Sequence, residues 1–303
     1  MSAHLVVLGP TASGKSDVAM AFASAHTGSE ILAVDAMQVY RRMDVGTAKP
    51  SEADRTAIAH HGIDLAEPSS EYTVAEFARA ASASVADIAA RGGRPVLVAG
   101  TGLYLRSITD PMEMPGRWPE VREGLESRVL AEGPEVLYRE LAALDPVAAS
   151  RMEPTNERRI VRALEVTIGG GRPFSRYGDG LGQYPPVPFV QVGLRWPRPM
   201  LAERIAARVH RMMAAGLLAE VAALLDEPMG LSRTARQALG YKELIAHLDG
   251  EYSLDEAVDT VILRTRQFAV RQERWFRRDP RIRWVDIEHD PVAEVLPVLQ
   301  DLA

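Results

Sequence analysis

The most chemically informative segment of the chain lies near its amino terminus and fits the pattern G-x-x-x-x-G-K-S. It consists of Gly9, Pro10, Thr11, Ala12, Ser13, Gly14, Lys15 and Ser16. In such a loop, backbone N–H groups and a helix N-terminus surround a diphosphate or triphosphate, the lysine adds a cation, and the final hydroxyl can bind Mg²⁺. We therefore predict a phosphate-binding loop with Ser16 as a magnesium ligand. The pattern does not distinguish ATP from a diphosphate ester, and a plain glycine turn that caps a helix is the alternative.

Lysine is nearly absent from the chain, because Lys15, Lys49 and Lys242 are the only lysines among 35 basic residues. An ammonium group is compact and has three donors, whereas a guanidinium group is planar. A chain that otherwise uses arginine is expected to keep lysine where only the compact cation fits. The three positions are therefore candidate functional residues, with chance as the alternative.

A carboxylate follows the second apolar run, in which Asp35 comes directly after Ile31–Val34. The runs Val96–Ala99 and Val190–Leu194 do not end in an acid, although typical nucleoside triphosphatases hold Mg²⁺ with an acid at such a position. Asp35 is therefore a candidate general base for a second substrate, within reach of the proton it removes. A helix cap or turn cap is the alternative.

A predicted helix over Met200–Ala215 places Arg204, Arg208 and Arg211 at positions i, i+4 and i+7, along one face. Such a row of arginines could reach over the glycine loop and neutralise a departing diphosphate. A solvated surface is the alternative reading of the same spacing.

The last long helix predicted from the sequence runs from Ser253 to about Arg278. At 100° per residue, five polar side chains fall within about 80° of one another: Arg264, Gln267, Arg271, Arg274 and Arg278. The stretch from Arg264 to Arg283 has eight arginines and two acids, in a chain whose net charge is −6. This concentration of positive charge indicates a polyanionic partner such as nucleic acid, unless it is only a solvated face.

The elements that must position these residues read as strands alternating with helices. Short apolar strands are predicted at Leu5–Leu8, Ile31–Val34 and Pro95–Ala99, the last followed by Gly100 and Thr101. This alternation predicts an α/β fold, a parallel sheet flanked by helices as in P-loop NTPases. Ligands bind beyond the carboxyl ends of such strands, so the glycine loop, Asp35 and Thr101 should meet at one site.

The character of the sequence changes after Pro111. Residues 121–168 read as helices with no strand, and residues 169–188 are rich in turn formers. We therefore expect residues 1–115 to form the first part of the core, residues 116–188 a helical insertion that contacts the polyanion, and residues 189–303 the second part of the core with the basic helix. The insertion carries another basic cluster of Arg158, Arg159 and Arg162.

Bulk composition excludes several classes of protein. Hydrophobic residues make up 47% and charged residues 25% of the 303 residues, as in ordinary globular chains. The absence of cysteine excludes disulfides, thiolate zinc sites and thiol nucleophiles. No apolar run approaches the ~20 residues that span a bilayer, and no basic segment precedes the first apolar run. We expect a cytoplasmic, monomeric protein that does not bind membranes.

Taken together, these motifs resemble one family, the bacterial tRNA dimethylallyltransferases. Beyond the glycine loop, the matching segments are Asp35–Tyr40, Gly46–Pro50, Gly100–Tyr104, Arg158–Val166, Gly240–Glu243 and Thr265–Gln272. They follow the family's order over nearly the whole chain and include all three lysines. Two departures exchange one small residue for another, since Ala36 stands where the family usually has serine and Ala99 where it usually has glycine.

The resemblance implies transfer of a dimethylallyl group from dimethylallyl diphosphate to N6 of the adenosine 3′-adjacent to the anticodon, with release of diphosphate. By this similarity Asp35 accepts the amine proton and Thr101 orients the amine. Diphosphate is held by the glycine loop, Arg208 and Mg²⁺ on Ser16. The residues expected at the tRNA anticodon arm are Asp35, Ala36, Met37, Gln38, Thr101, Arg122, Arg158, Arg159, Arg162, Lys242, Arg264, Arg271 and Arg274.

Two other functions use the same motifs. A small-molecule kinase would hold ATP in the glycine loop and use Asp35 to activate a substrate hydroxyl. A nucleotide-switch module that binds RNA without catalysis would show nucleotide-dependent RNA affinity and no covalent product. Release of ADP coupled to an alcohol would identify the kinase.

Overall fold

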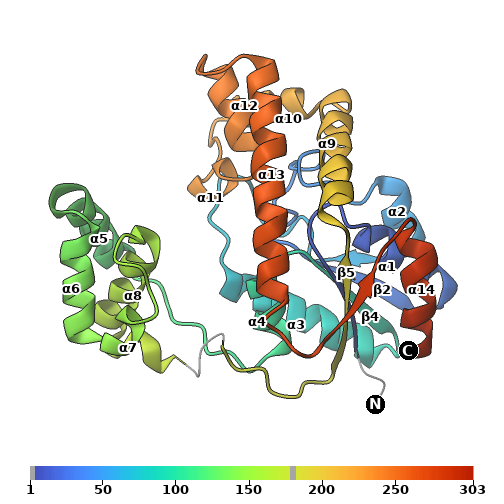
Figure 1. Ribbon diagram of the computed structural model, residues 1–303, viewed down its shortest axis with the longest axis horizontal. Helices are drawn as coiled ribbons and strands as arrows, with labels where there is room; N and C mark the ends of the chain where they lie inside the picture. Colours follow the sequence, from blue (N-terminus) through green and yellow to red (C-terminus); the bar gives the residue numbers. More distant parts are fainter. Residues whose placement is uncertain (1–3, 178–181, 303) are drawn as a thin grey trace. The chain divides into compact units, whose positions relative to one another are not determined.

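The computed structural model describes residues 4–177 and 182–302, which form two compact units (Figure 1). Unit 1 comprises the described residues before Asp110 and after Pro185, and unit 2 is the segment between these boundaries. Both boundaries lie near those expected from the sequence, at residues 116 and 188. The phosphate-loop motif, Asp35 and the basic helix all belong to unit 1.

Unit 1 is built on a six-stranded sheet with the order β3-β2-β4-β1-β5-β6, in which every neighbouring pair is parallel. The strands are β1 (His4–Leu8), β2 (Ser29–Val34), β3 (His60–His61), β4 (Arg94–Ala99), β5 (Phe189–Arg195) and β6 (Ile282–Asp286). The three central apolar runs are buried on both faces, as expected for a parallel sheet covered by helices. The predicted α/β fold is confirmed.

Side chains of β1 alternate between two hydrophobic cores, one on each face of the sheet. Leu5 and Val7 join one core, and Val6 and Leu8 join the other. Helices that contribute to the first core are α1 (Lys15–Ala25), α9 (Arg198–Ala214) and α14 (Pro291–Leu302). Those that contribute to the second are α3 (Val74–Ala90), α4 (Gly102–Thr109), α10 (Leu217–Leu225), α11 (Arg233–Arg236) and α12 (Tyr241–Leu248). Helix α13 (Leu254–Phe276) contributes to both, and α2 (Glu52–Ala57) follows the loop after β2.

Two elements near the carboxyl end were missed by the sequence analysis. Strand β6 lies at the sheet edge, directly after an arginine-rich stretch, and two of its five residues are the charged Arg283 and Asp286, so it has no long apolar run. Helix α14 contains Pro297, a residue that usually interrupts a helix and that hides the pattern. Among the described residues, no helix is both long and apolar enough to cross a bilayer.

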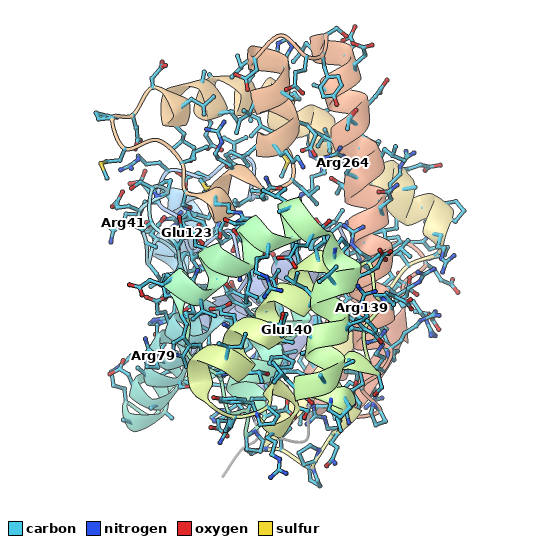
Figure 2. All side chains as sticks on the ribbon, turned by 90° about the vertical axis from the view of Figure 1, so that its left-hand side faces the viewer. Arg41, Arg79, Glu123, Arg139, Glu140 and Arg264 are labelled. Carbon is cyan, nitrogen blue, oxygen red and sulfur yellow. The ribbon has the colours of Figure 1, made fainter. Side chains whose placement is uncertain are left out.

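Among the described residues of unit 2, all regular secondary structure is helical. It contains α5 (Pro119–Glu132), α6 (Pro134–Leu144), α7 (Pro146–Ala149), α8 (Glu157–Gly170) and the 3₁₀ turn η1 (Phe174–Arg176). Leu125, Leu141 and Ile160 lie in its own hydrophobic core. Its helices carry surface charges of both signs, such as Glu123 and Arg139 (Figure 2). The turn-rich stretch expected from residue 169 begins only after α8, and residues 178–181 of it lie outside the described part of the chain.

Candidate active site

The glycine loop, residues Gly9–Ser16, connects β1 to α1 and is held by contacts from outside. The carbonyl oxygen of Ala12 accepts a hydrogen bond from Arg204 Nε at 2.8 Å, and that of Ser13 accepts from Trp196 Nε1 at 2.9 Å. The Arg204 guanidinium also lies 4.4 Å from the centre of the Trp196 ring. Side chains from outside the loop therefore fix two of its carbonyl groups.

The end of the glycine loop presents donors that have no protein acceptor. Among the described residues, the backbone N–H groups of Gly14, Lys15 and Ser16 have no hydrogen-bond acceptor. They belong to the N-terminus of α1, where the helix dipole favours an anion. Gly14 has φ of +89°, and a Cβ there would lie 2.5 Å from Pro291 Cγ. Only glycine therefore allows this tight entry into the helix.

Lys15 and Arg208 supply positive charge to the wall of the same cavity. Burial and the neighbouring Arg208 lower the pKa of Lys15 to about 8, against the opposing attraction of Asp35 and Asp17. Burial likewise lowers the pKa of Arg208, which Asp35 partly offsets. Two desolvated cations close to each other are stabilised by an anion that brings more than one negative charge. This arrangement favours a diphosphate as the ligand.

Asp35 follows β2 directly and uses its two oxygens differently. Oδ1 accepts hydrogen bonds from the backbone N–H of Met37 at 2.8 Å and of Gln38 at 3.3 Å, so it caps a turn. Oδ2 has no hydrogen-bond partner among the described residues. The capping role and the role of a base were alternatives in the sequence analysis, but this geometry allows both.

Three side chains from distant segments converge at Gly100. A Cβ built on this glycine would lie 3.4 Å from Gln272 Nε2, 3.5 Å from Lys15 Cε and 3.6 Å from Asp35 Oδ2. Thr101 is the next residue, half-buried, and its carbonyl oxygen accepts a bond from the Leu105 N–H at the start of α4. Thr101 adjoins this point but does not line the cavity.

The cavity that contains these groups has a volume of about 1370 Å³. It extends from the glycine loop past Asp35 and Gln38 to the loop around Lys49. This exceeds the roughly 300–1,000 Å³ of common small-molecule sites, which leaves room for a second substrate group beside a diphosphate. The predicted row of arginines on α9 also lines it, through Arg204, Arg208 and Arg211. Arg204 and Arg208 are half-buried there, whereas Arg211 is exposed.

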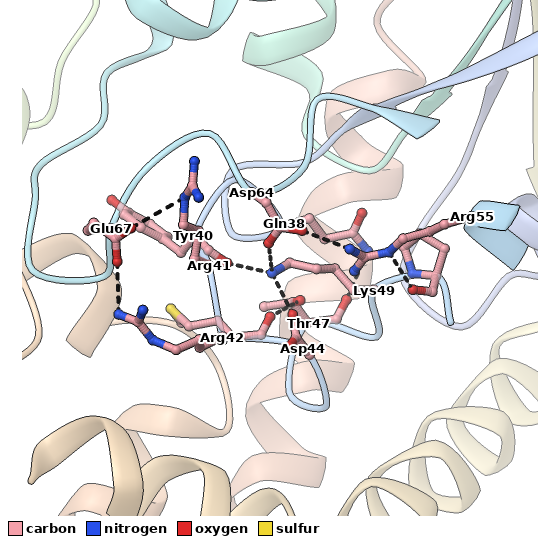
Figure 3. A network of polar contacts seen from close by, with 12 residues as sticks. Gln38, Tyr40, Arg41, Arg42, Asp44, Thr47, Lys49, Arg55, Asp64 and Glu67 are labelled. Atoms are coloured by element: carbon pink, nitrogen blue, oxygen red, sulfur yellow. Dashed lines mark hydrogen bonds and ion pairs between the residues drawn. The ribbon is translucent and has the colours of Figure 1, made fainter. Parts of the chain in front are cut away.

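The loop after Asp35 is organised by Lys49, whose side chain is 1% exposed (Figure 3). Its Nζ donates to Tyr40 O at 2.5 Å, to Asp44 Oδ1 at 2.6 Å and to Asp64 Oδ1 at 2.7 Å. Asp64 also accepts a bond from Arg55 at 2.8 Å. A compact cation with three donors is what the scarcity of lysine led us to expect at this position.

The Lys49 loop fixes the orientation of Gln38. Gln38 Nε2 donates to Thr47 O at 3.0 Å (Figure 3). It also donates to Ala48 O at 3.1 Å. Both amide hydrogens are therefore used, and Oε1 is the remaining hydrogen-bonding atom of this cavity-lining side chain. Gln38 can act on a ligand as an acceptor.

The same loop is held from its other side by Glu220, a residue that the sequence analysis did not consider. Its carboxylate accepts bonds from the N–H groups of Asp44, Val45 and Gly46 at 2.7–3.1 Å and from Tyr241 Oη at 2.5 Å. A Cβ on Gly46 would lie 2.4 Å from Tyr241 Cε2, so glycine is required there. Lys242 follows Tyr241 and is exposed.

The predicted basic face of α13 is only partly free. Arg271 and Arg274 are exposed. Arg264, labelled in Figure 2, pairs with Glu243 at 2.9 Å, and that carboxylate is 2% exposed. Arg264 therefore has a structural partner within the protein.

In unit 2, the arginines expected at the tRNA also fall into two groups, those paired with an acid of the protein and those exposed to solvent. Arg122 and Arg162 both pair with Glu165, at 3.2 and 3.0 Å, and the Glu165 side chain is 1% exposed. Arg158 and Arg159 are exposed on α8. The first two neutralise a buried carboxylate, whereas the second two face solvent.

Gln272 on α13 lines the cavity, and, like Glu220, it was given no role in the sequence analysis. Its signal was a polar residue at helical spacing within the apolar stripe of Phe268, Trp275 and Phe276. Such a residue must find buried partners.

Comparisons with known proteins agree with this geometry. The family model described as IPP transferase matches residues 38–279, and one described as isopentenyl transferase matches residues 1–61. The tRNA dimethylallyltransferase of Geobacter metallireducens is 45% identical over 93% of this chain and 92% of its own length. That of Thermobifida fusca is 46% identical over 94% and 90%, respectively.

Solved structures show the same similarity. A tRNA isopentenylpyrophosphate transferase from Bacillus halodurans has a TM-score of 0.70 and 33% identity, covering 100% of this chain and 97% of that one. A eukaryotic dimethylallyltransferase acting on tRNA has a TM-score of 0.78 and 25% identity, covering 94% of this chain and 74% of that one.

Proposed function

The chain belongs to the IPP transferase family, and we propose that it transfers a dimethylallyl group from dimethylallyl diphosphate to N6 of the adenosine 3′-adjacent to the anticodon of tRNA. The observation that carries this assignment is the convergence of Lys15, Asp35 and Gln272 at Gly100, inside a cavity with room for two substrate groups. It is a tRNA-modifying prenyltransferase, as are its relatives.

The diphosphate is bound by the glycine loop. The free N–H groups at the N-terminus of α1 and the cations Lys15 and Arg208 offset the charge that grows on the diphosphate as it departs. Because these donors are already in place, they need no rearrangement during the reaction. Arg204 contributes indirectly, since it holds the loop through Ala12.

Magnesium fits the donor set as a cation held mainly by the substrate. No group of three His, Cys, Asp or Glu side chains that could hold a metal occurs among the described residues. The exposed Ser16 hydroxyl at the cavity wall can supply one oxygen ligand, and the phosphates and water supply the others. Bound there, Mg²⁺ would offset charge on the diphosphate.

Asp35 is the general base. The lone pair of an adenine amine is delocalised into the ring, so the amine becomes a competent nucleophile only as its proton is removed. In the transfer, the bond from N6 to the allylic carbon forms and the bond from that carbon to the diphosphate oxygen breaks. The N6 proton passes to Asp35 Oδ2, which has no partner, while Oδ1 keeps the carboxylate fixed. Thr101, the residue after Gly100, orients the amine.

The tRNA anticodon arm is bound by positive charge outside the cavity. The exposed Arg271 and Arg274 of α13 and Arg158 and Arg159 of unit 2 contact its phosphates. The target base must leave its stack to reach Asp35, and Gln38 then accepts a hydrogen bond from a base edge. We further propose that the enzyme acts as a monomer in the cytoplasm, where its substrate is found.

The test is to incubate the enzyme with dimethylallyl diphosphate, Mg²⁺ and tRNA from cells that lack the modification, and to digest the product for mass spectrometry. The expected result is one prenylated adenosine, located beside the anticodon. A parallel reaction with ATP and alcohols examines the kinase alternative. An unmodified nucleoside together with ADP formation would overturn the proposal.

A further inference from the structure

Gln272 joins two segments of the active site that are far apart in sequence. The side chain is buried on α13, and its residue is 7% exposed. Its Oε1 accepts a hydrogen bond from the Thr11 N–H of the glycine loop at 2.9 Å. Its Nε2 donates to the Gly100 carbonyl oxygen at 2.7 Å. One amide therefore connects the diphosphate loop with the peptide that precedes Thr101.

Helix α13 also holds the peptide on the other side of Thr101. Trp275, one turn after Gln272, packs on Gly102, where a Cβ would lie 2.0 Å from the indole atoms Cδ1 and Nε1. Thr101 therefore lies between two glycines that the same helix fixes, one by a hydrogen bond and one by ring contact. A small displacement of α13 would move Thr101 relative to Lys15 and Asp35.

We propose that Gln272 is a positioning residue for prenyl transfer, which sets the place of Thr101 against the glycine loop. This inference rests on the proposed function and on the role of Thr101 in it. A side chain that fills the same space without hydrogen bonds leaves the partly buried Thr11 N–H and the buried Gly100 carbonyl group unpaired. The two segments then separate or rotate, and the geometry for attack is lost.

The position of Gln272 on α13 gives this contact a second consequence. Arg271 and Arg274 on the exposed side of the helix are proposed tRNA ligands. Helix α13 therefore carries both the proposed RNA-binding arginines and the side chain that holds the glycine loop and Gly100.

The experiment compares Gln272→Met, which keeps the size of the side chain and removes both hydrogen bonds, with Gln300→Met as the matched control. Gln300 is exposed on α14, away from the residues that line the cavity. Steady-state rates are measured with dimethylallyl diphosphate and tRNA. We expect kcat of Gln272→Met to fall by about tenfold or more, as a misplaced reacting group predicts, with KM for tRNA within about twofold. The control should match the native enzyme.

A double-mutant cycle with Thr101→Ala distinguishes positioning from a general structural effect. If Gln272 acts through Thr101, the substitution Gln272→Met lowers kcat of the Thr101→Ala enzyme by less than about threefold. An undiminished loss in that background would overturn the inference. So would a kcat of Gln272→Met equal to that of the control.

Gln272→Glu serves as a second variant should Gln272→Met fail to fold. Its carboxylate retains an acceptor for the Thr11 N–H but has no donor for the Gly100 carbonyl group. The same cycle is applied to it, and native kcat would contradict the inference. If the native enzyme forms no prenylated adenosine, the proposed function fails. If it does and both variants are unimpaired, only the role of Gln272 fails.

Discussion

The Lys49 ammonium group lies 2.7 Å from the Asp64 carboxylate, and the lysine side chain is 1% exposed. Asp44 and the Tyr40 carbonyl oxygen complete its three acceptors. The loop that Lys49 closes supplies the two carbonyl groups that bind the Gln38 amide. This buried cation therefore acts on the active site by holding the loop that orients Gln38. Its three hydrogen bonds go to Tyr40, Asp44 and Asp64 and not to Asp35.

Lys49→Met is expected to lower the free energy of unfolding by about 2–3 kcal/mol, because it leaves two carboxylates without their buried partner. The value is below the full cost of breaking a buried pair, since Asp44 is half exposed and Asp64 keeps Arg55. Denaturant unfolding measures it. Lys242→Met, at an exposed lysine, is the control and should leave stability unchanged within about 0.5 kcal/mol. Equal effects of the two substitutions would show that the network is not stabilising.

Asp35→Asn is expected to reduce kcat by about 10² or more while tRNA affinity stays near the native value. Asparagine retains the oxygen that accepts from Met37 and Gln38, so the turn should persist, but it cannot accept a proton. Single-turnover kinetics and filter binding provide the two measurements. Near-native turnover would remove Asp35 from the role of base.

Some residues of the candidate site could be predicted from the sequence, and others could not. The glycine loop, Asp35 and the α9 arginines were found because each follows a strand or repeats at helical spacing, which are local signals. Gln272 and Glu220 were not, because the loop segments that they hold lie more than 150 residues away along the chain and only the fold brings them together. Arg122, Arg162 and Arg264 appear as free cations in the sequence, since a buried partner carboxylate cannot be recognised without the packing.

Gly14→Ala should destabilise the protein more than Gly216→Ala, although both glycines have positive φ, +89° and +94°. The left-handed backbone costs an alanine about 1–2 kcal/mol at either position. At Gly14 the new Cβ also meets Pro291 at 2.5 Å, whereas nothing lies within 4 Å of a Cβ at Gly216. The difference between the thermal unfolding temperatures of the two variants measures the cost of the contact between the new Cβ and Pro291. Identical losses would mean that Pro291 moves aside freely.

Glu30 should contribute to stability at neutral pH and lose that contribution in acid. Hydrogen bonds from Arg91 and His61 lower its pKa to about 2 from 4.5, against the opposing effect of burial. For a depressed pKa the stabilisation is complete above about 4.5 and is lost as the pH falls towards 2. Measured by denaturant unfolding across this range, the native protein should lose stability more steeply than Glu30→Gln. Arg91→Gln removes the main cause and should flatten the curve in the same way; a native-like slope in both variants would contradict the assignment.

Salt dependence of tRNA binding should separate the arginines that contact phosphate from those that hold the protein together. Each phosphate contact releases counterions, so its loss reduces the slope of log affinity against log salt by roughly 0.7–0.9. We expect this reduction for Arg271→Gln and for Arg274→Gln, which change exposed residues of α13. Arg264→Gln should leave the slope unchanged and instead lower the free energy of unfolding, because it strands the buried Glu243 carboxylate. A slope that drops for Arg264→Gln but not for the other two would place the tRNA backbone nearer the amino-terminal part of α13.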